Sequence, residues 1–343
     1  MTNKKRTSIS ALGKVAFIEK LTAPFKNDKI ETSGDDAAVL PREGYYELVA
    51  VATMFEGIDF DLTYFPLQHL GYKAVVKAVS NIYAMNGRAE YIIVSIGLSA
   101  RFAVEDADAL YEGIKHAADD YSVSLIGGNT SASMTGLTLA VTAVGRVDTD
   151  RLATRGGAQL NDVVCVTGNL GAAYMGLQLL EREKRSVGGD GIVAPKLEGY
   201  EYILGNQLKP TARRDVIESL AEAGLVPTSM IDITSGLASA SLHLCHSSKL
   251  GIRLYLDRIP ISSQTFKMAE ELSIDPVVAA LNGGDDFQLL FTVPLDKHKE
   301  VVAIGGVDVI GHMVAESKGA ALTTPDGSEI TISAPDWTSV ESR

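Results

Sequence analysis

The stretch "TSGDDAAVL" (Thr32–Leu40) places two carboxylates, Asp35 and Asp36, side by side directly after a glycine and before a short apolar run. Two like charges about 4 Å apart repel by about 4 kcal/mol at an effective dielectric constant near 20. A bound cation removes this repulsion, and hard cations such as Mg²⁺ prefer carboxylate oxygens. The pair therefore predicts a cation site, and a nucleotide phosphate is the next candidate as the ligand behind that cation.

Three further segments have the same character, with glycine beside Asp or Asn at the edge of a predicted strand. They are Gly127–Thr130, Asp232–Gly236 and Gly283–Asp286. Glycine lets the backbone approach a phosphate closely, and Asp or Asn supplies hard oxygen ligands. Because Gly-Asp and Gly-Asn are also common turn residues, each segment alone is more typical of a simple turn. Together they indicate a possible phosphate and metal site.

The composition sets the broad class of the protein. The chain has 343 residues, 46% of them hydrophobic and 22% charged, with a formal net charge of −12. This length favours two domains, and the acidic balance argues against a nucleic-acid partner. No apolar run reaches the roughly 18 residues of a membrane span, and the two cysteines form no disulfide framework. We expect a cytoplasmic protein with no membrane association.

Hydrophobic periodicity predicts alternating helices and strands in the first part of the chain. We expect helices over 66–87 and 104–118, strands over 91–98 and 137–147, and a strand that begins at Val123 and stops at Gly127–Gly128. The composition turns polar and glycine-bearing over 148–162. We place a domain boundary there, which gives an N-terminal domain of residues 1–150 and a C-terminal domain of residues 151–343.

The second part of the chain begins again with a strand and a helix. We expect strands over 162–168, 228–233 and 286–293, and helices over 170–183, over 212–222 and from Gly236. The polar, glycine-rich stretch 184–196 is predicted to be a mobile loop. The alternation predicts an α/β or α+β fold.

Other residue types leave alternatives open. His243 and His246 share one helical face, but Cys245 points away from it and no further ligands are evident, so a zinc site is disfavoured. Neither a P-loop nor a nucleophile-elbow motif is present. Arg155 either clamps a phosphate or forms a surface salt bridge. Trp337, the only tryptophan, either plugs the end of the fold or stacks on a flat ligand ring.

The ordered set of motifs resembles a known family. The segments "GDDAAVL" (34–40), "LIGGNT" (125–130), "TRGGAQLND" (154–162), "MIDITSGL" (230–237) and "GGDDFQLLFTV" (283–293) carry the resemblance. They are similar to those of bacterial thiamine-monophosphate kinases, within the aminoimidazole ribonucleotide synthetase superfamily. The resemblance extends from about residue 7 to the tail.

The resemblance implies a fold, a reaction and a set of ligands. The fold would be a two-domain α/β (α+β) structure of the aminoimidazole ribonucleotide synthetase type. Its N-terminal domain would bind ATP and metal and contribute strands to a barrel at a homodimer interface, and its C-terminal α/β domain would close the nucleotide cleft. The reaction would be direct, in-line phosphorylation of thiamine monophosphate by ATP with Mg²⁺, which requires positioning and charge neutralisation.

The resemblance also assigns roles to individual positions. It implies catalytic roles for Asp36, Arg155 and Asp232; metal ligands at Asp35, Asp36, Asn81, Asn129, Asp232 and Ser235; ATP contacts at Gly127, Gly128, Asn129, Arg155 and Thr234; and substrate contacts at Asp59, Asp285 and Trp337.

Seven positions depart from the family pattern: Asp59 stands where the family has a substrate-contacting His, Thr234 where it has a Ser and Asp285 where it has a Glu, and the other four are metal-binding positions. Ala52, Asn81, Asn129 and Ser235 each stand where the family has a metal-binding Asp, so four negative charges are lost, and Asp59 returns one if it points inward. A weaker anionic field binds fewer hard cations. Three functions therefore stay open: a kinase that uses fewer metal ions, a silent paralog that binds nucleotide or a thiamine-like ligand, and a kinase of another small phosphorylated metabolite.

Overall fold

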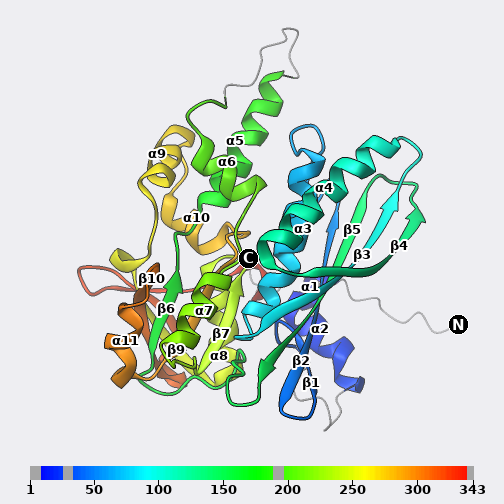
Figure 1. The fold of residues 1–343 in the computed structure, drawn as a ribbon. Helices are drawn as coiled ribbons and strands as arrows, with labels where there is room; N and C mark the ends of the chain where they lie inside the picture. The colour runs from blue at the N-terminus through cyan, green and yellow to red at the C-terminus, as the bar shows by residue number, and fades with distance from the viewer. Residues whose placement is uncertain (1–8, 26–33, 188–196, 338–343) are drawn as a thin grey trace, which may run out of the picture.

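The computed structural model describes residues 9–25, 34–187 and 197–337 (Figure 1). Most of the predicted loop at 184–196 lies outside these residues. The described chain forms a five-stranded sheet followed by a seven-stranded sheet, with helices around both. None of the helices in these ranges is both long enough and apolar enough to cross a membrane.

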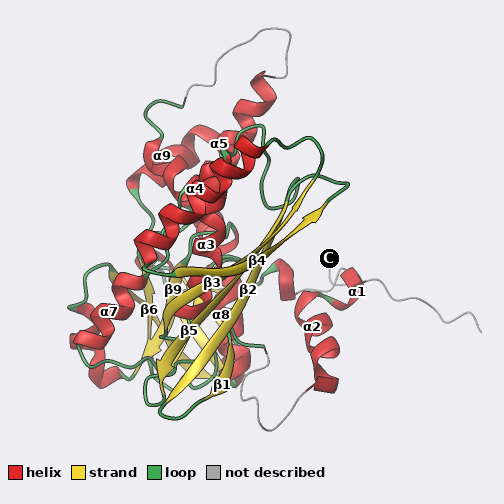
Figure 2. Ribbon diagram, turned by 45° about the vertical axis from the view of Figure 1, so that its right-hand side comes forward, coloured by secondary structure: helices red, strands yellow, loops and turns green. Residues whose placement is uncertain are grey.

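The first sheet has the strand order β1-β2-β5-β3-β4. Its strands are β1 (Ala38–Pro41), β2 (Tyr45–Phe55), β3 (Arg88–Leu98), β4 (Ser124–Ala132) and β5 (Thr138–Asp148). The β3–β4 pair is parallel and the other pairs are antiparallel. A parallel pair needs a crossover, which α4 (Val104–Tyr121) supplies. Together with α3 (Leu67–Tyr83), α4 lies along one side of the sheet (Figure 1, Figure 2).

Strand β4 corrects one prediction. We expected the strand to stop at Gly127–Gly128 and form a tight loop, but it continues to Ala132 in register with β3. The close approach of β3 explains why a glycine occupies the second position. A Cβ on Gly128 would lie 2.2 Å from the carbonyl oxygen of Val94. Gly128 therefore permits close strand pairing, and Gly127–Gly128 form no separate loop.

The two faces of the first sheet differ in how well they are covered. The inner face, with Ala52, Val94 and Val141 in one row, is buried against α3. The outer face carries large apolar side chains open to solvent: Val51 (66% exposed), Phe55 (47%) and Tyr91 (42%). We use the name outer face for the side of the first sheet on which Val51, Phe55 and Tyr91 lie. Contiguous exposed apolar surface of this kind marks an interaction site more often than chance.

The second sheet has the order β12-β11-β8-β10-β6-β9-β7. Its strands are β6 (Val163–Thr167), β7 (Ser229–Ile233), β8 (Leu250–Tyr255), β9 (Gln288–Val293), β10 (Val307–Ala315), β11 (Ala320–Thr323) and β12 (Glu329–Thr331). The helices around it are α5 (Ala172–Val187), α6 (Glu201–Leu208), α7 (Arg214–Glu222), α8 (Leu237–Ser248), α9 (Ser263–Leu272), α10 (Pro276–Asn282) and α11 (His298–Val302). Two short helices, α1 (Ile9–Leu12) and α2 (Lys14–Thr22), precede the first sheet.

One hydrophobic core joins the two sheets. Val79 of α3 belongs to the same buried cluster as Met230 of β7 and Phe291 of β9. A second cluster packs α8 against the opposite face of the second sheet, through residues such as Ile231 and Leu237. Helix α3 is therefore buried from both sides, and its few polar side chains are held at the junction of the two sheets.

Candidate functional site

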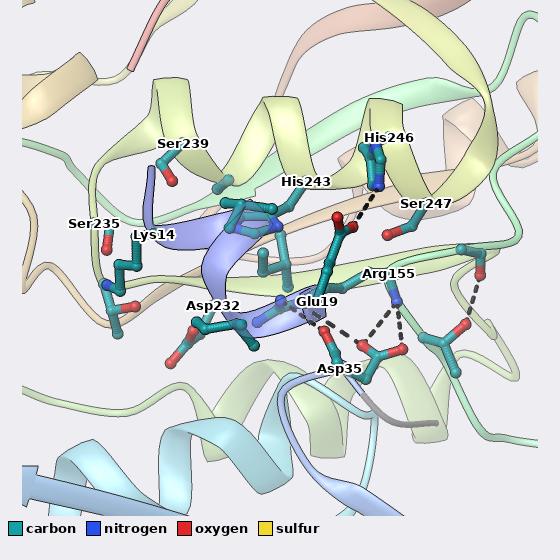
Figure 3. Close-up of a pocket in the computed structure, with 18 of the residues that line it drawn as sticks. Lys14, Glu19, Asp35, Arg155, Asp232, Ser235, Ser239, His243, His246 and Ser247 are labelled. Atoms are coloured by element: carbon teal, nitrogen blue, oxygen red, sulfur yellow. Dashed lines mark hydrogen bonds and ion pairs between the residues drawn. The ribbon is translucent and has the colours of Figure 1, made fainter. Parts of the chain in front are cut away.

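A pocket of about 650 Å³ lies where the loop before β1, the segment at Thr154–Gly156, the end of β7 and helix α8 meet (Figure 3). We call it the Asp232 pocket. Helix α2 forms its outer wall, with Lys14 and Glu19 facing the cavity, and Glu19 contacts His246 of α8 at 3.1 Å. Five of the predicted site residues gather here although they come from three distant parts of the sequence: Asp35, Arg155, Asp232, Thr234 and Ser235.

Arg155 holds the adjacent carboxylates together. Its Nη2 donates to Asp36 Oδ1 at 2.5 Å and its Nε donates to Asp36 Oδ2 at 3.3 Å. Its backbone N–H donates to Asp35 Oδ1 at 3.0 Å. Burial, and then repulsion from Asp36, raise the pKa of Asp35 to about 6. The cation beside the Asp35–Asp36 pair in this structure is thus the guanidinium of Arg155, and the surface-salt-bridge alternative is wrong because both side chains are largely buried.

Asp232 is the least compensated of these carboxylates. Its side chain is 4% exposed, and its Oδ2 has no hydrogen-bond partner among the described residues. Burial, and then repulsion from Asp36, raise the pKa of Asp232 to about 7. The Ser80 hydroxyl and the positive charges of Arg155 and Lys77 act in the opposite direction. Asp36 and Asp232 therefore share one electrostatic site, and an uncompensated buried oxygen is suited to a cation.

This raised pKa predicts a pH-dependent stability effect of Asp232→Asn. Between pH 4 and 7 the folded protein keeps a proton on Asp232 that the unfolded chain loses, so wild-type stability falls as pH rises. Asparagine does not ionise. We expect the variant to be more stable than the wild type by at least about 1 kcal/mol at pH 8, with no gain at pH 4.

Urea denaturation in EDTA at both pH values measures this difference, and Asp257→Asn, at an exposed aspartate, is the matched control. A gain of equal size at pH 4 and pH 8 would contradict the expectation.

A second pocket, of about 560 Å³, lies on the other side of the β7–α8 connection. We call it the Asp285 pocket. Asp59 and Asp285, both predicted substrate contacts, line it, and Asp61 and Glu181 add further acidic groups. Thr234 lines both pockets, so the two cavities meet at this residue.

Two lysines of α3 supply the positive charge beside the Asp285 pocket. Lys73 is fully buried, and its Nζ lies 2.9 Å from Asp285 Oδ2 and donates to the Gln207 carbonyl oxygen at 3.0 Å. Lys77 Nζ lies 3.1 Å from Asp59 Oδ1. Burial alone would raise the pKa of Asp285, but Lys73 and Lys77 lower it below its usual range. Because Lys77 also lowers the pKa of Asp232, its ammonium group acts on both pockets.

Sequence reasoning missed both lysines. They lie four residues apart in a stretch of α3 that is otherwise apolar, so they share one helical face. A charged side chain in a buried helix needs a counter-charge, so two lysines in an apolar helix indicate that two acidic partners lie nearby. The partners of Lys73 and Lys77 are Asp285 and Asp59, which the sequence predicts only as substrate contacts.

The predicted residues of β4 do not join the Asp232 pocket within one chain. Asn129 lies in a row with Thr53, Ala140 and Ser95, on the outer face of the first sheet. Ala52 lies on the inner face, and three strand spacings of about 4.8 Å separate its strand from β4. Asn129 Nδ2 donates to Ser131 Oγ at 3.2 Å. Gly127 lies on the same exposed strand, so the proposed ATP contacts at 127–129 are apart from Asp232.

Two other predicted residues have local partners. Asn81 Nδ2 donates to the Lys77 carbonyl oxygen at 3.0 Å, which leaves its side-chain oxygen available. Trp337 lies apart from the Asp285 pocket, with its ring 4.8 Å from that of His243 and 5.4 Å from that of His246. Its indole Nε1 is buried with no hydrogen-bond partner among the described residues.

The side chains of the site fit one divalent cation better than several. Within residues 9–25, 34–187 and 197–337, no group of three or more His, Cys, Asp or Glu is arranged to hold a metal ion. Asp232 nevertheless presents a buried, unpaired carboxylate oxygen next to Asp36. A hard cation at this point would take oxygen ligands from Asp232 and Asp36, and would compete with Arg155 for the latter.

Comparison with known proteins identifies the chain's relatives. Residues 34–147 match the N-terminal domain of AIR synthase related proteins, and residues 161–322 match the C-terminal domain. The thiamine-monophosphate kinase of Aquifex aeolicus (strain VF5) is 30% identical over 290 residues, which cover 84% of this chain and 88% of that protein. That of Bacillus subtilis (strain 168) is 31% identical over 265 residues, 76% of each chain.

The solved structure of AaThiL complexed with AMPPCP and TMP superimposes with a TM-score of 0.82 at 26% identity. The match covers 95% of this chain and 97% of that chain.

Proposed function

The chain belongs to the thiamine-monophosphate kinase family, within the AIR synthase related proteins, and from this premise we propose that it phosphorylates thiamine monophosphate to thiamine diphosphate with ATP. The observation that carries the proposal is the meeting of two pockets at Thr234. One pocket would hold the nucleotide and the other would hold the acceptor. The phosphoryl group would pass between them near Asp232.

The Asp285 pocket supports a cationic acceptor. Among the described residues, Asp59, Asp61, Glu181 and Asp285 line it together with Lys184, and the ammonium groups of Lys73, Lys77 and Lys184 each pair with one of the three aspartates, which leaves Glu181 without a basic partner. Thiamine monophosphate carries a permanently cationic thiazolium ring, which acidic side chains attract and which aromatic rings bind by cation–π contact. Tyr64 and Tyr174 line the same pocket. A neutral or wholly anionic acceptor would gain less from this lining.

The Asp232 pocket supports the nucleotide. Arg155 would exchange its contact with Asp36 for the nucleotide phosphates, because a guanidinium binds phosphate oxygens bidentately. Thr234 and Ser235 would offer hydroxyl donors at the start of α8, where the helix dipole favours anions. Mg²⁺, when bound through Asp232 and Asp36, would neutralise the phosphate charge. This chain lacks four family carboxylates, so we infer that it uses fewer metal ions.

The direct test is turnover by the purified protein. With ATP, Mg²⁺ and thiamine monophosphate, we expect thiamine diphosphate to accumulate. The weak clustering of acidic groups favours a second candidate, a silent paralog that still binds nucleotide. No turnover in the wild type, together with turnover after the joint substitutions Ala52→Asp, Asn81→Asp, Asn129→Asp and Ser235→Asp, would support that candidate. Consumption of ATP only with another phosphorylated metabolite would support a different acceptor.

Lys77 provides a prediction about metal dependence. Its ammonium group is a positive charge near Asp59, Asp232 and Asp285. Removing one unit charge about 10 Å from a divalent cation strengthens cation binding by roughly 1–2 kcal/mol at an intermediate dielectric constant. We therefore expect Lys77→Met to lower the Mg²⁺ concentration for half-maximal ATP binding about tenfold.

Calorimetric titration of ATP at graded Mg²⁺ concentrations measures this shift even if turnover is absent. Lys115→Met, at an exposed lysine that also pairs with an aspartate, is the control. An unchanged Mg²⁺ requirement in Lys77→Met would mean that Lys77 lies outside the field of the metal.

We further propose that the outer face of the first sheet binds a second copy of the chain. Its exposed apolar residues give the driving force, and the copy that covers them would carry its own Asn129 and Gly127 into the interface. In this arrangement the β4 residues of one protomer would serve a site shared with its partner.

Val51→Lys tests the dimer. Val51 is 66% exposed at the centre of the outer face, and a charge there would be buried without a partner in a dimer. We expect sedimentation to show a dimer for the wild type and a monomer for the variant. Val302→Lys, at a valine 51% exposed on α11, is the control and should leave the dimer intact. A wild-type monomer at micromolar concentration would contradict the proposal.

A further inference from the structure

A separate cavity of about 480 Å³ lies at the C-terminal end of α3, where the start of β3, the end of β5 and helix α7 converge. Four arginines line it: Arg88, Arg146, Arg151 and Arg214. We call it the arginine pocket. It has no role in the reaction proposed above, and it shares no lining residue with the Asp232 or Asp285 pocket.

The arginines retain much of their donor capacity. Each guanidinium has five N–H donors. Arg146 pairs with Glu90 at 2.9 Å, and Arg151 donates to the Leu225 carbonyl oxygen at 3.2 Å. Arg214 Nε donates to Glu218 at 2.7 Å. Arg88 makes no ion pair or side-chain hydrogen bond with any residue that the structure describes.

Charge in the cavity runs against the charge of the whole protein. Asp148 and Glu218 are the acidic residues that line it, against four arginines. With Glu90, the partner of Arg146, three acidic groups stand against the four arginines, so the cavity keeps a small positive excess, whereas the chain has a formal net charge of −12. Like charges that face one shared space repel, so an anion that fills this space is stabilised by all of them.

Two buried polar atoms beside the cavity also lack partners. Tyr83, the last residue of α3, is 1% exposed and Asn86 is 4% exposed. Tyr83 Oη and Asn86 Oδ1 have no hydrogen-bond partner among the described residues, although both residues line the pocket. Asn86 is held in place because its Nδ2 donates to the Arg151 carbonyl oxygen at 2.7 Å. Buried polar groups are normally paired, so the unpaired Tyr83 hydroxyl points to a missing ligand or water.

The charges next to the Tyr83 hydroxyl place it among the arginines. Burial, and then Tyr121 and Glu218, raise the pKa of Tyr83, while Arg214 and Arg88 act against this rise. The hydroxyl is thus within electrostatic reach of two arginines from different parts of the chain. A phosphate oxygen in the cavity would accept a hydrogen bond from Tyr83 and from the guanidinium groups together.

We propose that the arginine pocket binds a small polyanion that carries a phosphate or diphosphate group. Guanidinium groups match phosphate oxygens in geometry and keep their charge at all physiological pH values. The acidic surface of the remaining chain disfavours a nucleic acid as the ligand. Because the lining comes from both halves of the chain, the ligand would contact the first sheet and α7 at once.

Titration calorimetry in EDTA, with inorganic phosphate, pyrophosphate and ATP as separate probes, tests the proposal. We expect pyrophosphate to bind, with at least a tenfold loss of affinity in Arg88→Gln. Tyr83→Phe should weaken binding several-fold and leave the unfolding temperature unchanged or raised, since it removes an unpaired buried hydroxyl. Arg258→Gln, which alters an exposed arginine that contacts Tyr255, is the control.

The outcomes separate the possibilities. Affinity lost in Arg88→Gln but retained in Arg258→Gln supports the site, and the order of the three probes identifies the size of the anion. Equal pyrophosphate affinity in wild type and Arg88→Gln overturns the proposal. A single-stranded oligonucleotide that binds more tightly than pyrophosphate and depends on Arg88 would also overturn it. Neither substitution touches the Asp232 pocket, so the result stands whether or not the protein turns over thiamine monophosphate.

Discussion

Replacing Asp285 with asparagine is expected to lower the free energy of unfolding by about 3–5 kcal/mol, because it leaves the buried Lys73 ammonium group without a counter-charge. Lys73 is fully buried, and its other hydrogen-bond partners are the carbonyl oxygen and side chain of Gln207. Asparagine keeps the size of Asp285 and tolerates its positive φ of 57°. The substitution therefore isolates the loss of charge.

The two partners of this ion pair are not equivalent. The side chain of Asp285 is 32% exposed to the Asp285 pocket, so water can solvate it when Lys73 is removed. We therefore expect Lys73→Met to cost less than Asp285→Asn. Methionine also suits the place beside Phe65, whose ring centroid lies 5.7 Å from Lys73 Nζ, because thioether sulfur makes favourable contacts with aromatic rings. The double substitution Lys73→Met with Asp285→Asn should recover part of the stability lost in Asp285→Asn.

Urea denaturation measures these differences. Lys115→Met breaks an exposed pair with Asp119, for which we expect at most about 0.5 kcal/mol. If Asp285→Asn lowers the free energy of unfolding no more than Lys115→Met does, the Lys73 amino group is uncharged or solvated in the native protein. The interpretation of Lys73 as a buried charge that needs Asp285 would then be wrong.

The second large effect concerns catalysis. We expect Asp232→Asn to lower kcat by about a thousandfold, or about 4 kcal/mol of transition-state stabilisation. Asp232 is the carboxylate with an unpaired buried oxygen in the Asp232 pocket, two residues before Thr234, which lines both pockets, and an amide cannot supply its charge. The same substitution stabilises the apo protein above pH 7, so activity and stability should move in opposite directions.

Steady-state assays of thiamine diphosphate formation measure this effect, with Asp257→Asn as the surface control. Retention of more than a tenth of wild-type kcat by a folded Asp232→Asn would remove Asp232 from the catalytic centre. In that case Asp36 and Arg155 would have to position the phosphates without it.

Much of the fold follows from periodicity. The helices predicted over 66–87 and 104–118 are α3 and α4, and the strand predicted over 137–147 is β5. Strand β2 escaped recognition because Val49 and Val51 are apolar on the outer face while Leu48 and Ala50 are apolar on the inner face, so no polar alternation marks it. The end of β4 was placed wrongly because glycine was read as a break, when close pairing with β3 requires it.

The site was predictable where motif residues lie next to strand ends. Asp35, Arg155, Asp232 and Thr234 do converge on one pocket. The spacing of motifs in the sequence does not reveal on which face of a sheet a side chain lies. Asn129 belongs to the outer face of the first sheet because of its register with Ser95, and no local pattern reveals this.

The core that runs unbroken from the first sheet through α3 to β7 and β9 has an evolutionary consequence. Val79, Met230 and Phe291 belong to one buried cluster that spans the two halves, so the packing surface of each half is complementary to that of the other. A gene recombination that joins the first half of this chain to the second half of a relative would bring together surfaces that were never selected as a pair. We therefore expect chains of this architecture to diverge by paired substitutions in the shared core, and not by recombination that exchanges one half for that of a relative.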